Sequence, residues 1–227
     1  MSVDEMIIPF KGRSGLKQYV PKIPCKWGYK LWAQAGISGY VYCFEIYYGG
    51  VNVDDSKNAG VGGEVVKRLC HDISGRNHKI YADNYFSNIQ LLLDLRDKQI
   101  WYVGTIRFDR LQGLYKLLKS KKEMKSLGRG ATNVMTSSKG LTVVQWHDNA
   151  LVHTISTYAG IYPQDTDKRF SKKQIKHIQI GRPFAIKTYN DHMGGVDLMD
   201  FLLLYRNYRK HRRWHLRIFT ISSMWLL

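Results

Sequence analysis

The sequence predicts an α/β protein built around a mixed sheet, and three observations support this. The first 50 residues are rich in aromatic and β-branched residues and contain several turn signals, a composition typical of strands joined by loops. Residues 64–106 then alternate between helical spacing and short apolar runs. With 227 residues and 44% apolar content, the chain is long enough for one large domain, or for one domain with a substantial insertion.

The expected elements up to residue 106 follow a regular order. They are a strand over 3–10, a loop over 11–26, two strands within 27–48 around a turn at 36–39, a loop over 49–63, a helix over 64–73, a strand over 79–83, a helix over 87–95 and a strand over 101–106. Ser87 is the expected N-cap of the second helix, because a serine side chain accepts a hydrogen bond from the first turn. The order β-β-β-α-β-α-β, with Asp4 and Asp83 at the ends of the first and fourth strands, matches an RNase H-like sheet.

The residues that follow do not fit that core and predict a basic, β-rich insertion subdomain. Two strand-like runs flank a turn at 147–150, and basic stretches surround them; the runs are 141–146 and 151–158, and the stretches are 116–129 and 168–187. The helical pattern returns at Tyr189. We therefore expect three segments: 1–106, the first part of the RNase H-like core; 107–187, the insertion; and 188–227, the C-terminal helices of the core.

The charge balance predicts a polyanionic partner. The chain has 35 Lys and Arg against 18 Asp and Glu, for a formal charge of +17. Clustered cations bind a phosphate backbone by releasing its counterions. Charge alone also fits a simple soluble basic protein or a binding protein of the ribosomal type, so the choice depends on the acids.

Cysteine usage and hydropathy indicate an intracellular chain without a membrane span. Cys25, Cys43 and Cys70 lie far apart and form no Cys-x-x-Cys motif, and an odd count without a signal peptide predicts reduced thiols. The longest apolar stretches fall short of the roughly 18–20 residues that cross a bilayer.

Four aspartates on this basic chain are the candidate site: Asp4, Asp83, Asp197 and Asp200. Asp83 ends an apolar strand, where a charge is costly unless it is paired, hydrogen-bonded or bound to metal. Asp197 and Asp200 are three residues apart and share one face of a helix near its N-terminus, where the dipole favours negative charge. Taken singly, a strand-end aspartate bonded to loop amides or an ordinary acidic first turn explains them as well.

As a set, the acids predict a two-metal site for phosphodiester chemistry. Two Mg²⁺ ions about 3.5–4 Å apart serve the attacking and leaving oxygens, and Mg²⁺ prefers carboxylate and water ligands. We expect Asp4, Asp83 and Asp197 to hold the ions, with Mn²⁺ as a substitute. Zinc is the weaker hypothesis, because the one His-x-x-x-His pair, His211 and His215, has no cysteine or acid close in sequence.

Two basic segments are expected to emerge beside the acids and to contact DNA. Their residues are Lys11, Arg13, Lys17, Lys22 and Lys26, and then Arg206, Arg209, Lys210, Arg212, Arg213 and Arg217. Trp214, inside the second segment, fits packing under DNA or packing into the core.

At these residues the sequence resembles the piggyBac family of DNA transposases. The resemblance runs from Val3 to Trp214 and rests on five stretches in order: 2–13 (SVDEMIIPFKGR), 19–30 (YVPKIPCKWGYK), 82–87 (ADNYFS), 102–107 (YVGTIR) and 189–200 (YNDHMGGVDLMD). It implies a DDE/DDD transposase core in which Asp4, Asp83 and Asp197 are the catalytic triad and Asp200 is a nearby additional acid.

The resemblance also implies partners and a setting. It implies Mg²⁺-dependent cut-and-paste transposition of double-stranded DNA at TTAA targets through hairpinned transposon ends, a homodimer in the full-length form, and a nuclear location. The sequence begins three residues before Asp4, and by this resemblance we expect the family's N-terminal region and its cysteine-rich C-terminal domain to be missing from it. We therefore expect a catalytic core cut from a longer protein, or a decayed copy.

Whether the chain is an enzyme stays open on sequence grounds. The first hypothesis is a transposase catalytic domain, and the second is a domesticated or defective derivative that binds DNA without catalysis. A generic RNase H-like nuclease, including one that cleaves RNA, is a third, which the Gly-Gly-Val-Asp motif at 194–197 weakens.

Overall fold

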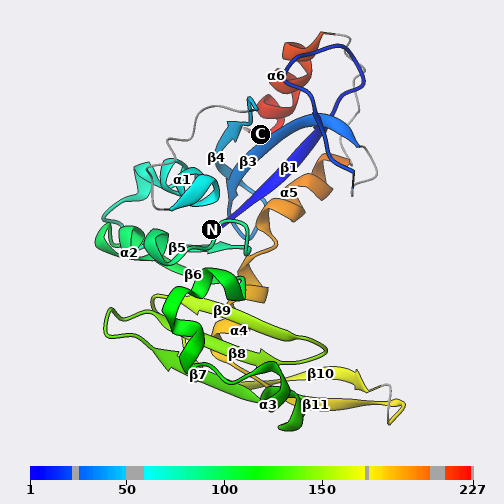
Figure 1. Ribbon diagram of the computed structural model, residues 1–227. Coiled ribbons are helices and arrows are strands. Elements are labelled where there is room, and N and C mark those ends of the chain that lie inside the picture. The colour runs from blue at the N-terminus through cyan, green and yellow to red at the C-terminus, as the bar shows by residue number, and fades with distance from the viewer. Residues whose placement is uncertain (22–25, 50–58, 172–173, 205–212, 226–227) are drawn as a thin grey trace.

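The computed structural model describes residues 1–21, 26–49, 59–171, 174–204 and 213–225. The described chain is a mixed α/β protein, as the sequence predicts (Figure 1). Its strands are β1 (Ser2–Pro9), β2 (Gln18–Tyr19), β3 (Trp27–Ala35), β4 (Val41–Ile46), β5 (Lys79–Ala82), β6 (Trp101–Thr105), β7 (Thr132–Thr136), β8 (Thr142–His147), β9 (Leu151–Ser156), β10 (Asp165–Ser171) and β11 (Lys176–Arg182). Its helices are α1 (Gly60–Leu69), α2 (Ile89–Asp97), α3 (Lys121–Ser126), α4 (Phe184–His192), α5 (Gly195–Leu204) and α6 (Trp214–Trp225), with 3₁₀ segments η1 (His71–Ile73) and η2 (Phe108–Leu117).

One sheet runs through most of the described residues. Its strand order is β2-β3-β1-β5-β6-β9-β8-β7, and β4 also pairs with β3. The neighbours β1–β5 and β5–β6 are parallel, whereas the other pairs in this sheet are antiparallel. The strands β7, β8 and β9, from the segment expected to be an insertion, therefore continue this sheet, while β10 and β11 form a separate ribbon. The division into three segments stays a prediction.

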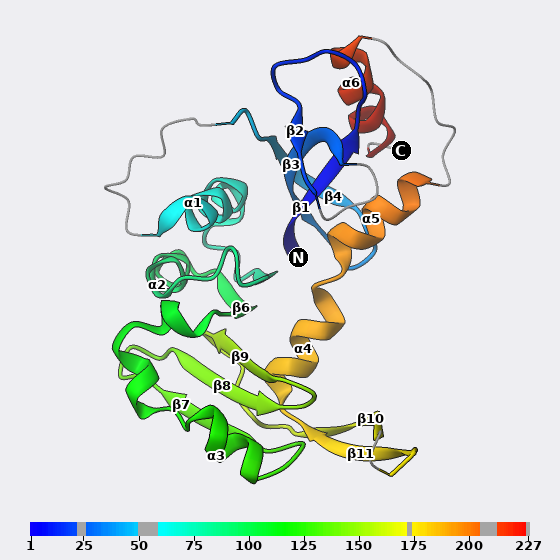
Figure 2. The same ribbon diagram turned by 45° about the vertical axis from the view of Figure 1, so that its right-hand side comes forward.

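Helices cover both faces of the sheet, because side chains alternate between its two faces along each strand. Val3 of β1 packs in a cluster with side chains of α1, α2 and η2. Met6 and Ile8 point to the opposite face and pack with α5 and α6. Further along that second face, α4 packs on β5, β6 and β8. Figure 2 shows α4 and α5 following one another along this face.

The strands β1, β3 and β4 confirm their predictions, whereas β2 lies in the predicted loop 11–26 and the predicted cap at residue 87 is wrong. The pattern over 27–48 gives β3 and β4, joined by a turn in which Gly39 has a positive φ of 81°. Ser87 is not the N-cap of α2: Asn88 is, with its side chain accepting from the Gln90 amide. The Ser87 hydroxyl instead contacts the Tyr102 hydroxyl at 2.9 Å in the interior.

Several boundaries differ from the predicted ones. α1 begins at Gly60 rather than residue 64 and ends at Leu69, after which the chain makes a 3₁₀ turn. α4 begins at Phe184, five residues before the predicted return of helix. The strands β2, β7, β10 and β11 were not predicted, because they are short or rich in polar and charged residues and none contains a long alternation of apolar and polar residues.

No helix in the described part of the chain has both the length and the apolar character needed to cross a membrane.

Candidate functional site

The sheet register places Asp4 beside the end of β5. β1 and β5 run parallel with Ser2 opposite Tyr81 and Val3 opposite Ala82, so the next residues along the two strands are Asp4 and Asp83. By alternation Asp4 points to the same face as Met6 and Ile8, which is the α5 face. Asp4 is the third residue of β1 rather than its last, so the expectation that it ends its strand is wrong. The parallel pairing, not the strand end, brings it to Asp83.

α5 carries Asp197 to this place through a contact with the start of β1. The buried Ser2 hydroxyl accepts a hydrogen bond from the Val196 amide at 3.2 Å and donates to the Ala35 carbonyl at 3.4 Å. A Cβ on Gly195 would overlap the Gly36 carbonyl oxygen and lie 2.7 Å from Ser2 Oγ. Only glycine therefore permits this close approach of α5 to the start of β1. Asp197 lies in the first turn of α5 and is brought near β1 with it.

The electrostatics of Asp4 link the three acids. Its pKa is raised to about 7, by burial first and also by the charges of Asp83, Asp197 and Glu5, while a hydrogen bond from the Glu5 amide opposes the shift. Neighbouring Glu5 points to the other sheet face and pairs with Lys30. Asp4 is thus the carboxyl that both other acids act on, and its protonation depends on their charge.

Asp83 begins a loop that is held by its own backbone amides and by the side chain of Arg110. Burial raises its pKa, and hydrogen bonds from the amides of Tyr85 and Phe86 lower it; the Tyr85 amide lies 2.7 Å from Asp83 Oδ1. Arg110 of η2 donates from one nitrogen to three carbonyl oxygens of this loop, those of Asn84 (2.7 Å), Tyr85 (2.8 Å) and Ser87 (3.2 Å).

Arg110 also lowers the pKa of Asp83 through its charge. It therefore holds the loop in place and stabilises the ionised carboxylate. Sequence reasoning missed Arg110, because nothing in its local pattern separates it from the other arginines of a basic chain.

Tyr189 of α4 lies within electrostatic range of Asp4, Asp83 and Asp197. Its pKa is raised to about 12, by burial first and also by the charges of Asp83, Asp4 and Asp197, while a hydrogen bond to Thr105 lowers it. The phenol is therefore a neutral hydroxyl at ordinary pH beside three acids. Tyr189 opens the stretch 189–200, and its local pattern predicts no role for the phenol.

Asp197 and Asp200 lie on the exposed side of α5, whereas Val196 and Met199 point into the core. Partial desolvation, and then the charge of Asp197, raise the pKa of Asp200. Its side chain is nevertheless exposed, and solvent screens much of this interaction. The acidic site thus has a half-buried side, at Asp4 and Asp83, and an open side on α5 from which a large ligand can approach.

The donor set suits a hard divalent cation, since carboxylate oxygens are the ligands that Mg²⁺ prefers. Among the residues that the structure describes, no three Asp, Glu, His or Cys side chains lie close enough together to coordinate one metal ion. The carboxylates of Asp4, Asp83 and Asp197 can still influence one another's charge at this separation, because Coulomb interaction acts over longer distances than the roughly 2.0–2.1 Å of a Mg²⁺–oxygen bond. The metal-ligand roles of Asp4, Asp83 and Asp197 stay a prediction.

The first basic segment does not emerge beside the acids. β1 and β3 pair antiparallel, with Asp4 opposite Ala33 and Pro9 opposite Gly28. The loop after β1 therefore leaves the sheet about 17 Å from Asp4, at roughly 3.3 Å per residue. Lys11, Arg13 and Lys26 are exposed there.

Lys17, in the same loop, places its ammonium 4.8 Å from the ring centre of Trp27 and donates to the Gly12 carbonyl. In both views the loop lies near α6 (Figures 1 and 2). Exposed Arg213 immediately precedes α6, and Arg217 lies within it. Five further candidates fall outside the described residues: Lys22, Arg206, Arg209, Lys210 and Arg212.

Comparison with known proteins identifies relatives over nearly the whole chain. A family model described as "Transposase IS4" matches residues 1–224. The human PiggyBac transposable element-derived protein 3 is 33% identical over 219 residues, covering 94% of this chain and 36% of that protein. The human PiggyBac transposable element-derived protein 2 is 29% identical over 203 residues, covering 88% of this chain and 34% of that protein. The chain thus spans about a third of the length of these relatives.

A solved structure shares the fold. It is described as the cryo-EM structure of a piggyBac transposase synaptic complex with hairpin DNA, and the similarity covers 99% of this chain and 44% of that chain with a TM-score of 0.75. The sequence identity is 23%, so the similarity establishes the arrangement of elements and leaves the chemistry to the residues.

Proposed function

The chain belongs to the piggyBac transposase family, and from this premise we propose that it is the catalytic domain of a DNA transposase that cleaves and transfers DNA strands with Mg²⁺. The observation that carries the proposal is the electrostatic link among Asp4, Asp83 and Asp197, which come from β1, the loop after β5 and α5. Acids from three distant parts of a chain with a charge of +17 would hold cations against a polyanion.

We propose a finer description of the fold on the same basis. The strands β1, β3, β4, β5 and β6 with α1, α2, α4 and α5 would form an RNase H-like core, and the segment 107–187 would be a β-rich insertion before the last catalytic helix. The element order supports this, since β5, α2 and β6 follow the three-stranded antiparallel unit β1-β3-β4.

In the proposed site, Asp4, Asp83 and Asp197 would hold two Mg²⁺ ions, or Mn²⁺ in their place. Bound there, the metal would neutralise charge on the phosphodiester and promote ionisation of the attacking hydroxyl or water. Asp200 adds negative charge beside Asp197. The Tyr189 hydroxyl can donate a hydrogen bond to a carboxylate or a phosphate oxygen, and Arg110 keeps the Asp83 loop in position.

The proposed partner is double-stranded DNA, with transposon ends and TTAA targets as the substrates, acting in the nucleus. The solved structure with the same fold is described as a complex with hairpin DNA, which supports a DNA partner for this chain. We propose a homodimer for the full-length form.

A second function has an observation of its own. Two relatives are human proteins named as transposable element-derived, which favours a domesticated or defective derivative that binds DNA without cutting it. The two proposals predict the same DNA binding and differ in strand cleavage.

Replacing Asp83 by Asn tests the catalytic proposal. The amide keeps the shape of the side chain but removes the charge that binds a cation, so Mg²⁺-dependent nicking of transposon-end DNA should fall at least about 100-fold, the scale on which catalytic groups act. Duplex binding should stay equal or become slightly tighter, since a repulsion toward phosphate is lost. Nicking is measured on labelled end DNA with the chain expressed within its complete reading frame.

Asp72→Asn is the matched control, because the Asp72 side chain is 97% exposed on η1 and should leave nicking unchanged. Full nicking by the Asp83 variant would refute its role as a metal ligand. Tight binding with no nicking by the wild type, in the presence of Mg²⁺ or Mn²⁺, would support the derivative without catalysis.

A further inference from the structure

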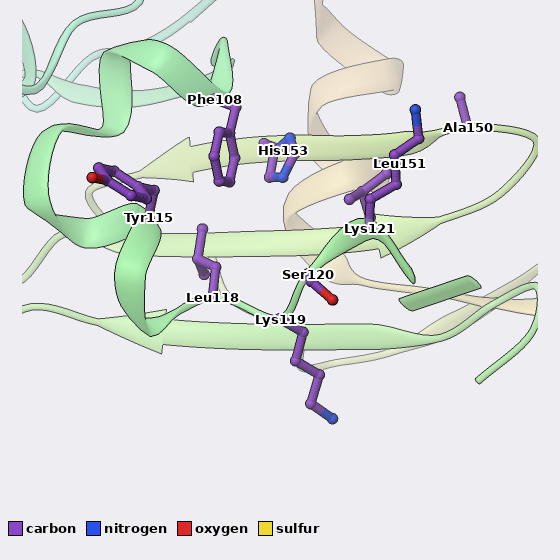
Figure 3. A pocket seen from close by; sticks show the side chains of 9 residues that line it. All are labelled: Phe108, Tyr115, Leu118, Lys119, Ser120, Lys121, Ala150, Leu151 and His153. Carbon is purple, nitrogen blue, oxygen red and sulfur yellow. The ribbon is translucent and has the colours of Figure 1, made fainter. Parts of the chain in front are cut away.

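A cavity of about 530 Å³ lies apart from the acids, where η2 and the turn into α3 cross over the sheet (Figure 3). Its volume falls within the range of about 300–1,000 Å³ that is usual for small-molecule sites. The walls come from three places in the chain: η2 with Phe108 and Tyr115, the turn that carries Lys119 and Lys121, and β9 with Leu151 and His153.

Aromatic rings line this cavity although they are not buried. Phe108 is 46% exposed and Tyr115 is 43% exposed. Their ring centres lie 5.7 Å apart, and the Phe108 ring lies 5.4 Å from the His153 ring. Exposed rings that face a cavity leave apolar surface for a flat ligand to cover, and every nucleobase can stack on such a ring.

The hydrogen bonds around His153 leave a donor in this wall. Gln145 Oε1 accepts from the Lys119 amide (3.1 Å) and from Asn133 Nδ2 (2.9 Å), which fixes the orientation of the Gln145 amide. Gln145 Nε2, a donor, then lies 3.2 Å from His153 Nε2, so this ring nitrogen accepts. The imidazole carries its proton on Nδ1, which can bond to an acceptor on a ligand edge.

The rim of the cavity is cationic and held in place. The segment 116–129 contains six Lys and Arg residues and one Glu. Gln145 bonds to both the amide and the carbonyl of Lys119, each at 3.1 Å, and Ser120 begins α3 through a capping box with Glu123. Lys119 and Lys121 are exposed on either side of Ser120. Two cations beside the aromatic rings suit a ligand that carries an anionic group next to a planar ring.

We propose that this cavity binds an unpaired nucleobase of the DNA substrate, stacked on Phe108 and Tyr115, with its phosphate toward Lys119 and Lys121. The inference rests on the proposed function for its DNA partner. The position supports it: Phe108 stands three residues after β6, and Arg110 of the same η2 segment holds the loop that follows Asp83. The cavity itself opens on the η2 face of the sheet, opposite to the α4 and α5 face to which Asp4 points, so the base bound there would belong to a nucleotide that flanks the one at the acids.

The test compares two duplexes that differ by one extra, unpaired base. Anisotropy with the wild-type chain should give tighter binding to the bulged duplex than to the fully paired one. Phe108→Ala should reduce that preference by about 5- to 150-fold, or to none, because stacking on an aromatic side chain contributes about 1–3 kcal/mol per base. Phe108→Tyr should retain it. With 5-iodouracil as the unpaired base, light should crosslink it to Phe108, Tyr115 or His153.

Phe170→Ala is the matched control. Phe170 is 50% exposed and packs edge-on against His177, with ring centres 5.5 Å apart, on the β10–β11 ribbon. The substitution therefore removes a similar ring outside the cavity and should leave the preference for the bulged duplex unchanged. Equal binding of both duplexes by the wild type, or an unchanged preference in Phe108→Ala, would overturn the cavity proposal while DNA binding stands. If the chain bound neither duplex, the proposed function would fail together with it.

Discussion

Asp4 is the residue in which burial and charge act together. Three features of the site around it were not visible as a local pattern: the Ser2 hydroxyl that anchors α5, the Arg110 guanidinium that fixes the Asp83 loop, and the neutral Tyr189 phenol near all three acids. Each acts across a long sequence separation, so the local sequence around it carries no signal of its role. The acids themselves were predictable, because a carboxylate in an apolar strand is costly without a partner.

The raised pKa of Asp4 predicts a stability that depends on pH. The pKa is about 7 in the folded chain, against 3.8 for an ordinary aspartate, so the folded state binds the proton more tightly than the unfolded state. Its stabilising contribution is complete below about pH 4 and is lost as the pH rises through 7. Asp4→Asn cannot ionise and should raise the Tm at pH 8 by several degrees, with little change at pH 4, measured by thermal unfolding followed by circular dichroism.

Mg²⁺ provides the second half of that experiment. A ligand that binds only the folded state raises the stability of that state. Mg²⁺ should therefore raise the Tm of the wild type at pH 8, and it should raise the Tm of Asp4→Asn by a smaller amount. Asp72→Asn, on the solvent-exposed side of η1, should follow the wild type in all conditions. Equal Tm values for the wild type and Asp4→Asn at pH 8 would contradict the assigned pKa shift.

Among the elements, α5 shows how a predicted helix acquires its position. The Gly-Gly-Val-Asp stretch correctly predicted a helix with Asp197 in its first turn. The contact that sets its distance from β1 involves Gly195, Ser2 and the Gly36 carbonyl. The two adjacent glycines have different roles, since a Cβ on Gly194 would have no atom within 4 Å.

Gly195→Ala should therefore be destabilising and Gly194→Ala should not. Overpacking against a backbone carbonyl costs about 1–3 kcal/mol, which lowers the Tm by several degrees in a chain of this size. The same substitution should displace Asp197 and so weaken Mg²⁺-dependent nicking. Thermal unfolding of the two variants side by side is the measurement, and similar Tm values for both would show that α5 is not held by this close approach.

At the scale of the whole molecule, the positive charge is spread rather than focused on the acids. The loop with Lys11, Arg13 and Lys26 lies near α6 at one end of the molecule. The 116–129 segment lies over β8 and β9 at the opposite end. A bound duplex that touches the acids and either basic region would meet several cations along its backbone.

DNA binding should accordingly be independent of sequence and strongly dependent on salt. Each phosphate that is neutralised contributes about −0.9 to the slope of log affinity against log salt, and six to ten contacts lower the affinity by about 10³- to 10⁵-fold between 50 and 200 mM salt. Titrations of two duplexes of unrelated sequence at several salt concentrations measure both properties. A flat dependence on salt would contradict the electrostatic account.

The sequence by itself determined the mixed α/β class, most strands before residue 106 and the helix with Asp197 in its first turn, and it singled out four acids as candidates, because apolar periodicity, glycine turns and charges in apolar segments are local signals. Only the tertiary structure decided which strands are neighbours, and therefore that Asp4 meets Asp83 through parallel pairing while the loop of Lys11 leaves the sheet far from both. It alone also revealed that β7, β8 and β9 extend the sheet and that η2 encloses a cavity over it. Strand order and packing depend on which distant surfaces bury each other best, and no local pattern contains that information.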